Sequence, residues 1–260
     1  MLFQILTFLK YFWKSGNAHS VHSPFVFQLY TKGFKSKPPG NNELLQRINQ
    51  YKDSLYGDKR VIKVTDFGAG SRVFKSNTRE IRKIAKTAGI SAKNGQLLMN
   101  LIHFLKPKSI LEIGTSLGIS TAYMALAAPN SRIVTLEGCK ETASVAQKQF
   151  RDYKLDNIDL RVSKFADTLP KVLAEQHFDL VFFDGNHQKA PTLQYFDLCL
   201  KQAADNAVFI FDDIHWNPEM EETWNLIKKN PKVTVSIDIF QWGLVFFRGE
   251  QAKQNFILRP

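Results

Sequence analysis

The chain has 260 residues, of which 44% are hydrophobic and 12% aromatic, and its formal net charge is +11. This composition excludes an intrinsically disordered chain, and the length fits one large domain or one domain with an appendage. Its two cysteines, Cys139 and Cys199, form no Cys-x-x-Cys pair. They argue against a disulfide scaffold or a zinc–thiolate site and favour a reducing cytoplasm.

The chain begins with an apolar stretch, MLFQILTFLKYFWK, which is too short to span a bilayer and is interrupted by Lys10. No basic region precedes it and a poor cleavage region follows, so it does not resemble a signal peptide. The pattern favours an amphipathic helix docked on the body of the protein. An interfacial membrane helix is the alternative, and peripheral membrane contact stays open.

Positive charge is concentrated between Arg72 and Lys108, where nine Lys or Arg residues accompany a single acid, Glu80. A basic stretch attracts nucleic acid, anionic lipid or an acidic substrate, but it is more often a solvated helix face. This one lacks the aromatic interleaving of a base-stacking platform, so we expect no nucleic-acid partner. Asn77 and Glu80 also have the spacing of a helix capping box.

The pattern of elements changes near residue 91. Before it, helical pieces separated by breakers such as KSKPPGNN predict an N-terminal helical extension or lid over residues 1–90. After it, helices and buried strands alternate over residues 91–260. The predicted helices are 91–105, 119–128, 140–153, 166–176, 190–201 and 218–230. The predicted strands are 109–114, 132–138, 158–163, 178–185, 206–213, 233–240 and 243–249.

Strands that are apolar on both faces predict a parallel sheet covered by helices. We therefore expect an α/β fold, Rossmann-like and doubly wound, with a mostly parallel seven-stranded sheet whose last strand is antiparallel. The apolar closing strands also favour a homodimer contact. In such sheets, ligands bind beyond the carboxyl ends of the strands.

Two segments, VTDFGAGS at 64–71 and ILEIGTSLGIST at 110–121, each join an apolar run to an acid and glycines. After the second comes a small-residue helix and then a strand ending in Glu137, nineteen residues beyond Gly118, where a carboxylate can accept both hydroxyls of a ribose. The first segment lacks this context. We expect the second to bind the cofactor and the first to be a strand end with a glycine turn. A backbone nest for an anion beside Arg72 is the other interpretation of the first.

ILEIGTSLGIST, Glu137, FADTLP, FDLVFFDGNH and FIFDDIHW resemble the successive motifs of class I S-adenosylmethionine-dependent methyltransferases, closest to the catechol and caffeoyl-CoA type of O-methyltransferase. The resemblance covers residues 91–247, while the N-terminal part resembles that of uncharacterised bacterial methyltransferases. It implies that Glu112 and Gly114 lie near the methionine part of S-adenosylmethionine and Glu137 at the ribose. Lys164 and Phe165 would flank the adenine. The complete predicted cofactor-binding set is Glu112, Gly114, Thr115, Ser116, Gly118, Ser120, Glu137, Gly138, Lys164, Phe165 and Asp184.

Three carboxylates, Asp184, Asp212 and Asp213, lie at the ends of two adjacent predicted strands. The resembling family has Asp, Asp and Asn at these positions and binds magnesium there, which implies a site for Mg²⁺ or another divalent cation. Oxygen ligands suit such hard cations. Alternatively, Asp184 contacts only the donor, and the other two cap the following helix.

His187 stands three residues after Asp184, where the catechol type has a lysine base. A histidine can do the same work, so His187 and Asp184 are the predicted catalytic residues. A helix-capping histidine is the other interpretation. The family also implies an aromatic residue, Trp216, near the acceptor.

The sequence thus predicts an S-adenosylmethionine-dependent methyltransferase that carries out cation-assisted O-methylation of a small hydroxylated acceptor. The alternatives are a nucleic-acid methyltransferase that uses the basic stretch and a non-catalytic protein that binds a membrane surface. His19 and His22 are expected to be a structural pair, with a lid histidine at the acceptor pocket as the alternative.

Overall fold

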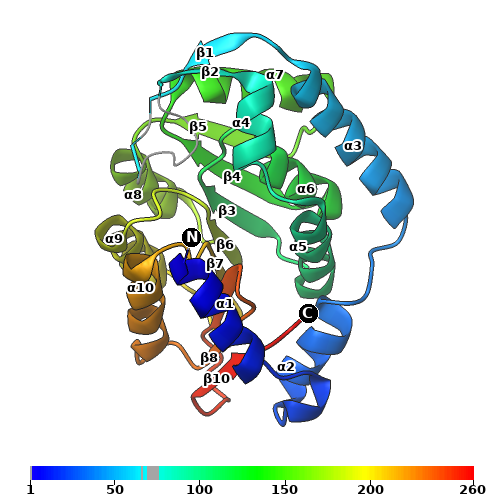
Figure 1. The fold of residues 1–260 in the computed structure, drawn as a ribbon. Coiled ribbons are helices and arrows are strands. Elements are labelled where there is room, and N and C mark those ends of the chain that lie inside the picture. The colour runs from blue at the N-terminus through cyan, green and yellow to red at the C-terminus, as the bar shows by residue number, and fades with distance from the viewer. Residues whose placement is uncertain (1, 66, 69–75) are drawn as a thin grey trace.

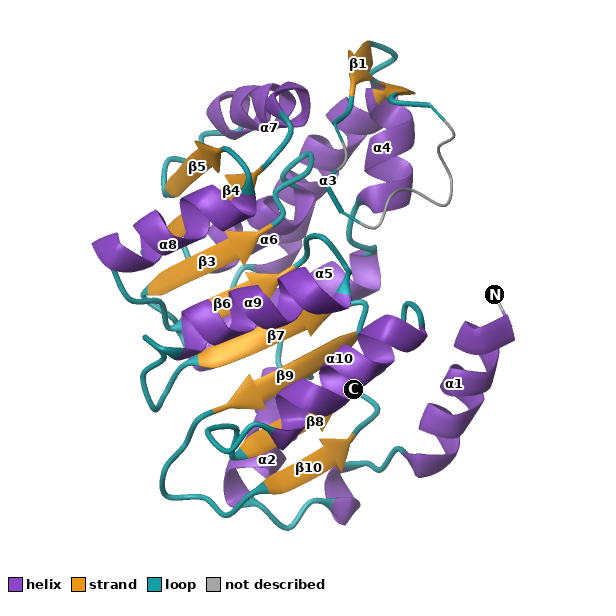
Figure 2. Cartoon of the chain, turned by 90° about the vertical axis from the view of Figure 1, so that its left-hand side faces the viewer, coloured by secondary structure: helices purple, strands orange, loops and turns teal. Residues whose placement is uncertain are grey.

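The computed structural model describes residues 2–65, 67–68 and 76–260. One large sheet has helices on both faces, as Figures 1 and 2 show, which confirms the predicted α/β class. Arg72, beside which an anion nest was considered, lies outside the described residues. Within the described part of the chain, no helix is long and apolar enough to cross a membrane.

The large sheet has eight strands in the order β10-β8-β9-β7-β6-β3-β4-β5. They are β3 Ser109–Ile113, β4 Arg132–Glu137, β5 Ile158–Val162, β6 Leu180–Phe183, β7 Val208–Asp212, β8 Val235–Asp238, β9 Trp242–Phe246 and β10 Gln254–Ile257. The strand β9 runs antiparallel to β7 and β8, and the other neighbouring pairs are parallel. The seven predicted strands are therefore present, with β9 as the antiparallel one.

The eighth strand, β10, lies outside the prediction. It pairs with β8 at the edge of the sheet and is only partly buried. A strand in that position does not need the apolar run that marks the other strands, and its sequence, QNFI, has none. The strands β8 and β9 are fully buried inside the sheet. Their apolar residues therefore serve the core, and the homodimer stays a prediction without support from them.

Two sets of helices cover the two faces of the sheet. One set is α5 Ala92–Leu105, α6 Ile119–Ala127 and α7 Lys140–Asp152; the other is α8 Phe165–Glu175, α9 Lys189–Leu200 and α10 Pro218–Lys229. The starts of α5 and α10 follow from local sequence: the side chains of Ser91 and Asn217 accept the amides of Asn94 and Met220 as N-caps. Each set packs its apolar residues into a separate cluster against the sheet.

The N-terminal part is helical except for a two-stranded sheet. Its elements are α1 Leu2–Lys14, η1 Ala18–Ser20, α2 Pro24–Gln28, η2 Leu29–Gly33, α3 Asn41–Gly57, β1 Val61–Lys63, β2 Thr78–Glu80 and α4 Ile81–Ala88. The predicted capping box is wrong, because Glu80 ends β2 and makes no side-chain cap. Buried residues of α2 and α3, among them Val26 and Ile48, share one cluster with Leu98 of α5 and Ile110 of β3. A division near residue 90 stays a prediction.

The helix α3 also supports the turn that follows β3. The hydroxyl of Tyr51 donates to the carbonyl oxygen of Leu117 over 2.8 Å, in a buried position. This hydrogen bond links the N-terminal part to the segment that sequence analysis assigns to the cofactor.

We expect Tyr51→Phe to lower the free energy of unfolding by about 1–3 kcal/mol, because the Leu117 carbonyl would stay buried without this donor. Urea denaturation measures the change. Tyr153→Phe is the matched control, since the Tyr153 hydroxyl donates to the carbonyl of Gln50 at an exposed position where water can replace it. Equal losses in the two variants would contradict this role for Tyr51.

Candidate functional site

The turn between β3 and α6 is tight and uses backbone conformations that favour glycine. Gly114 has a φ of 113° and Gly118 one of 76°. A Cβ atom at Gly114 would collide with the carbonyl group of Asp184. The amides of Gly114 and Thr115 donate to the carbonyl oxygen of Leu136 at 3.0 and 3.1 Å. The turn therefore fits closely between the carboxyl ends of β4 and β6.

The carboxylate of Glu137, at the end of β4, holds this turn in place. Its Oε2 accepts the amide of Ser116 at 2.7 Å, and its Oε1 accepts the amide of Cys139 at 2.9 Å. Burial raises the pKa of Glu137, and hydrogen bonds from these amides oppose the shift. Each oxygen has a second lone pair. Glu137 can therefore brace the turn and still accept hydroxyl groups of a ligand.

Glu112 lies fully buried beneath the turn. Its carboxylate accepts the hydroxyls of Ser120 and Thr121 at 2.5 Å each and that of Thr135 at 2.6 Å. Burial raises its pKa to about 7, although the three hydroxyls favour the charged form. Glu112 therefore acts as a buried brace of α6 and β4 under the turn.

A cavity of about 740 Å³ lies at the carboxyl edge of the sheet, where ligands of such folds bind. The predicted site residues that line it are Gly114, Ser116, Glu137, Gly138, Lys164, Phe165, Asp184, His187, Asp212 and Asp213. Trp216 lines it too. The structure thus brings together the predicted donor and acceptor residues in one space.

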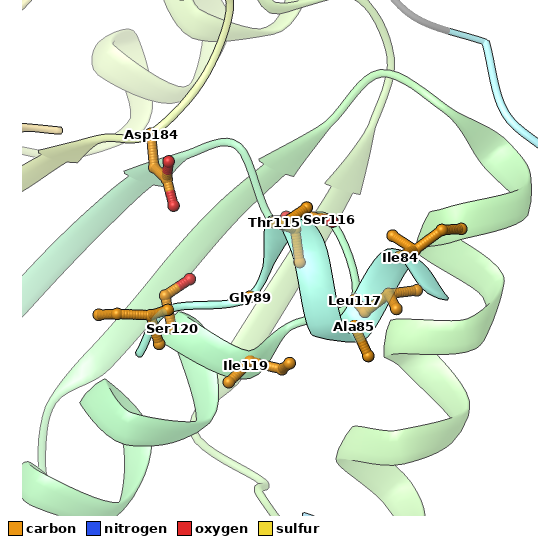
Figure 3. Close-up of a pocket in the computed structure, with 11 residues that line it drawn as sticks. Ile84, Ala85, Gly89, Thr115, Ser116, Leu117, Ile119, Ser120 and Asp184 are labelled. Carbon is orange, nitrogen blue, oxygen red and sulfur yellow. The ribbon is translucent and has the colours of Figure 1, made fainter. Parts of the chain in front are cut away.

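The remaining predicted residues lie behind the turn. Thr115 shares a hydrogen bond with Thr135, and a Cβ atom at Gly118 would meet the ring of Phe150 and the hydroxyl of Tyr51. An adjoining void of about 10 Å³ has room for about one water molecule. Figure 3 shows this void, with Asp184 to one side and Ile84 of α4 to the other.

The first glycine segment forms a wall of the same cavity, which sequence analysis missed. Its described residues Val64, Thr65, Phe67 and Gly68 line the cavity. The Phe67 ring lies so close to Gly138 that a Cβ atom there would come within 2.7 Å of it. The ammonium group of Lys164 lies 6.0 Å from the centroid of the same ring. No local signal indicates this approach, because it joins residues about seventy positions apart.

Three side chains form a group that can hold a metal ion. Ligand atoms of Asp184, His187 and Asp212 all lie within 4.8 Å of one another. Burial and the negative charge of Asp212 raise the pKa of Asp184 well above its usual range. A cation between these carboxylates would relieve their repulsion. The donor set therefore fits a divalent cation.

Asp213, the third predicted ligand, is held beside this group. Its backbone has a φ of 54°, and its Oδ1 accepts the side-chain amide of Gln241 at 2.7 Å. The same amide donates to Oδ1 of Asp212 at 3.0 Å. Sequence analysis missed Gln241. The antiparallel pairing of β7 with β9 brings its turn beside the end of β7.

Three further histidines, His19, His22 and His215, do not line the cavity. His215 is buried, and its Nε2 lies 2.9 Å from Oδ2 of Asp238. Its ring stacks on that of Phe240. His19 and His22 are exposed.

Comparisons with known proteins find methyltransferases. A family model described as a methyltransferase domain matches residues 111–214. A catechol O-methyltransferase of Niastella koreensis is 29% identical over 180 residues, which are 67% of this chain and 75% of that protein. A catechol O-methyltransferase of Mycobacterium tuberculosis is 35% identical over 141 residues, which are 54% of this chain and 61% of that protein.

Solved structures share the fold. The O-methyltransferase TomG of Streptomyces achromogenes, solved in complex with S-adenosylmethionine, has a TM-score of 0.56 and 26% identity over 62% of this chain and 82% of its own. An O-methyltransferase of Bacillus cereus has a TM-score of 0.53 and 24% identity over 62% of this chain and 83% of its own.

In folds of this kind a nucleoside binds at the carboxyl edge of the sheet, where an acid at the end of the second strand accepts the ribose hydroxyls. The cavity at this edge and Glu137 at the end of β4 provide both features. The chain carries a methyltransferase domain and is similar to O-methyltransferases of the catechol type, which agrees with the resemblance that its motifs showed.

We expect Glu137→Gln to weaken the binding of S-adenosylmethionine about tenfold or more, because hydrogen bonds to a charged group are lost and the glutamine amide opposes a backbone N–H. Isothermal titration calorimetry measures the affinity. Glu175→Gln is the control, because its carboxylate pairs with Arg161 on the surface. Unchanged affinity in Glu137→Gln would contradict the assignment.

The pKa of Glu112, raised from 4.5 to about 7 by burial, makes stability depend on pH. The folded chain binds this proton more tightly than the unfolded chain, so its contribution is full below about pH 4.5 and is lost as the pH rises through 7. In Glu112→Gln no proton titrates. When the pH is raised from acidic to mildly alkaline, the free energy of unfolding of the wild type should therefore fall by about 3 kcal/mol relative to that of Glu112→Gln.

Urea denaturation at the two pH values, with EDTA present, measures this gain. Glu222→Gln is the control, since its exposed carboxylate pairs with Lys189. A difference between Glu112→Gln and the wild type that is the same at both pH values would contradict the raised pKa.

Proposed function

We propose that this chain transfers the methyl group of S-adenosylmethionine to a hydroxyl of a small acceptor, assisted by a divalent cation. The observation that supports this proposal most is the position of Asp184. It lines the cavity beside the Gly114 turn, and it also belongs, with Asp212, to the group of side chains that can hold a metal ion. The donor half and the acceptor half of the cavity therefore meet at one residue.

The donor brings an already activated methyl group, so the protein must align the reactants and take up a proton. The carboxylate of Glu137 accepts hydrogen bonds from the ribose hydroxyls. Phe165 packs edge-on against Tyr195, with ring centroids 6.1 Å apart, and this contact orients it toward the adenine. Phe67 closes the same part of the cavity.

A divalent cation, when bound, lowers the pKa of the acceptor hydroxyl and fixes its position. Asp184 and Asp212 would hold it, and Asp213 lies beside them at the position where the resembling family has asparagine. The Gln241 amide orients both neighbouring aspartates through its two hydrogen bonds. The Mg²⁺ preference for oxygen ligands matches this carboxylate set.

His187 takes up the acceptor proton at its ring. Its Nε2 lies 3.6 Å from Oδ1 of Asp184, and its side chain is 26% exposed, so the proton has a route to solvent. From the same position His187 can also bind the metal ion. The His187→Gln experiment below distinguishes a general base from a metal ligand.

We infer that the acceptor is a molecule whose hydroxyl group is attached to a planar or apolar group. Trp216 and Trp242, the latter paired with Asp212 across the sheet, line the cavity, and such rings bind planar or apolar groups. The relatives reported above are O-methyltransferases by name, so the nucleic-acid and non-catalytic alternatives are not favoured. The two buried free cysteines support a cytoplasmic location.

We expect excess EDTA to lower the rate of methyl transfer to a catechol probe, 3,4-dihydroxybenzoate, about a hundredfold, and Mg²⁺ to restore it. Asp212→Asn should lose the Mg²⁺ response, whereas Asp197→Asn, at an exposed site on α9, should keep it. Transfer that continues unchanged in EDTA would exclude the metal.

We expect His187→Gln to lower kcat about a hundredfold or more while the Mg²⁺ concentration for half-maximal rate stays the same, as for a general base. The pH–rate profile should also lose its acidic limb. A tenfold rise in the Mg²⁺ requirement would instead assign His187 to the metal.

A further inference from the structure

The helix α1 contacts the rest of the chain through one narrow face. Thr7 and Tyr11 are its buried residues, and the Tyr11 hydroxyl donates to the carbonyl oxygen of Leu258 at 2.5 Å. The ring of Phe8 meets that of Phe240 edge-on, with centroids 5.0 Å apart. After the helix, Gly16 pairs with Leu258 in a parallel bridge. These contacts fix which side of α1 points outward.

The outward side of α1 is apolar. Its large hydrophobic residues are between 48% and 86% exposed, with Trp13 the most exposed. They are Leu2, Ile5, Leu6, Leu9, Phe12 and Trp13. Their spacing of three and four residues places them on one stripe along the helix. An ordinary surface helix shows the opposite pattern, and an exposed apolar patch of this kind marks a contact with something else.

The charged side chains of α1 itself are both lysines. Residues 1–42 contain five lysines and no acidic residue. Lys10 and Lys14 are exposed on α1 itself, and the guanidinium group of Arg259 lies 4.7 Å from the ring centroid of Phe12. Lysines beside an inserted apolar face are drawn to the negative surface of anionic lipids.

A second copy of the chain fits this face less well than a lipid surface. In a two-fold contact the same patch meets itself, so Lys10 and Lys14 would approach their own equivalents. Lysine is also depleted in protein–protein interfaces. At a bilayer, by contrast, lysine side chains reach to the headgroups and a tryptophan sits at the interface.

We propose that α1 binds reversibly to the surface of an anionic phospholipid bilayer, with Leu2, Leu6 and Leu9 among the acyl chains, Trp13 at the interface, and Lys10 and Lys14 at the headgroups. Figure 2 shows α1 on the side toward which β7 and β10 point, which is the side of the cavity. Phe240, which α1 contacts, precedes the cavity residue Gln241. The membrane-binding helix and the cavity therefore lie at the same edge of the sheet.

Co-sedimentation of the full chain with vesicles tests the proposal. We expect binding to vesicles of equal parts phosphatidylglycerol and phosphatidylcholine, and at least about tenfold weaker binding to phosphatidylcholine alone. Leu9→Glu with Trp13→Glu should lower the partition coefficient on anionic vesicles about tenfold or more. Lys10→Gln with Lys14→Gln should do so as well, and high salt should weaken wild-type binding.

The matched control is Leu226→Glu, because Leu226 is an exposed leucine on α10, 40% exposed, outside the stripe. It should bind vesicles like the wild type. All variants should bind S-adenosylmethionine with unchanged affinity by calorimetry, which shows that they fold and separates this test from that of the enzymatic function.

Two results would overturn the proposal. One is wild-type chain that stays in the supernatant with anionic vesicles. The other is a dimer in vesicle-free solution, seen by size-exclusion chromatography with light scattering, that Trp13→Glu converts to a monomer. That second outcome would assign the stripe to a second copy of the chain.

Discussion

The carboxylate of Glu137 accepts backbone N–H groups from two loops at once, from Ser116 after β3 and from Cys139 after β4. These hydrogen bonds fix the carboxyl ends of two adjacent strands before any ligand arrives. Glu112 secures the same turn from below through three hydroxyl groups. The shape of the donor site follows from these two acids, because the turn they hold lies where the cavity meets the sheet.

The sheet order explains why the chemistry gathers at this point. The chain passes from β3 to β4 on one side and returns to β6 on the other, so β3 has neighbours on both sides that leave a crevice at its carboxyl end. Gly114 can approach the Asp184 carbonyl because it lacks a side chain. The Asp184 carboxylate then reaches Asp212 at the end of the next strand. One crevice thus joins the Gly114 turn to the group formed by Asp184, His187 and Asp212.

The regular part of the fold could be predicted because it depends on local signals. Apolar runs marked the strands β3–β9, and the interval from Gly118 to Glu137 singled out an acid that the structure places in the wall of the cavity. The edge strand β10 was missed because it carries little apolar character. The Phe67 wall and the Gln241 brace were missed for another reason, since each depends on a contact between distant segments that no local pattern encodes. The docking of α1 was predicted, whereas the apolar character of its outer side emerged only once its buried face was known.

A crystal structure of the chain with S-adenosylhomocysteine tests the central claim most directly. The account predicts both ribose hydroxyls within hydrogen-bond distance of the Glu137 carboxylate, the adenine between Phe67 and Phe165, and the sulfur directed toward Asp184. A ligand bound outside the crevice between β3 and β6, with Glu137 still occupied only by the amides of Ser116 and Cys139, would contradict it.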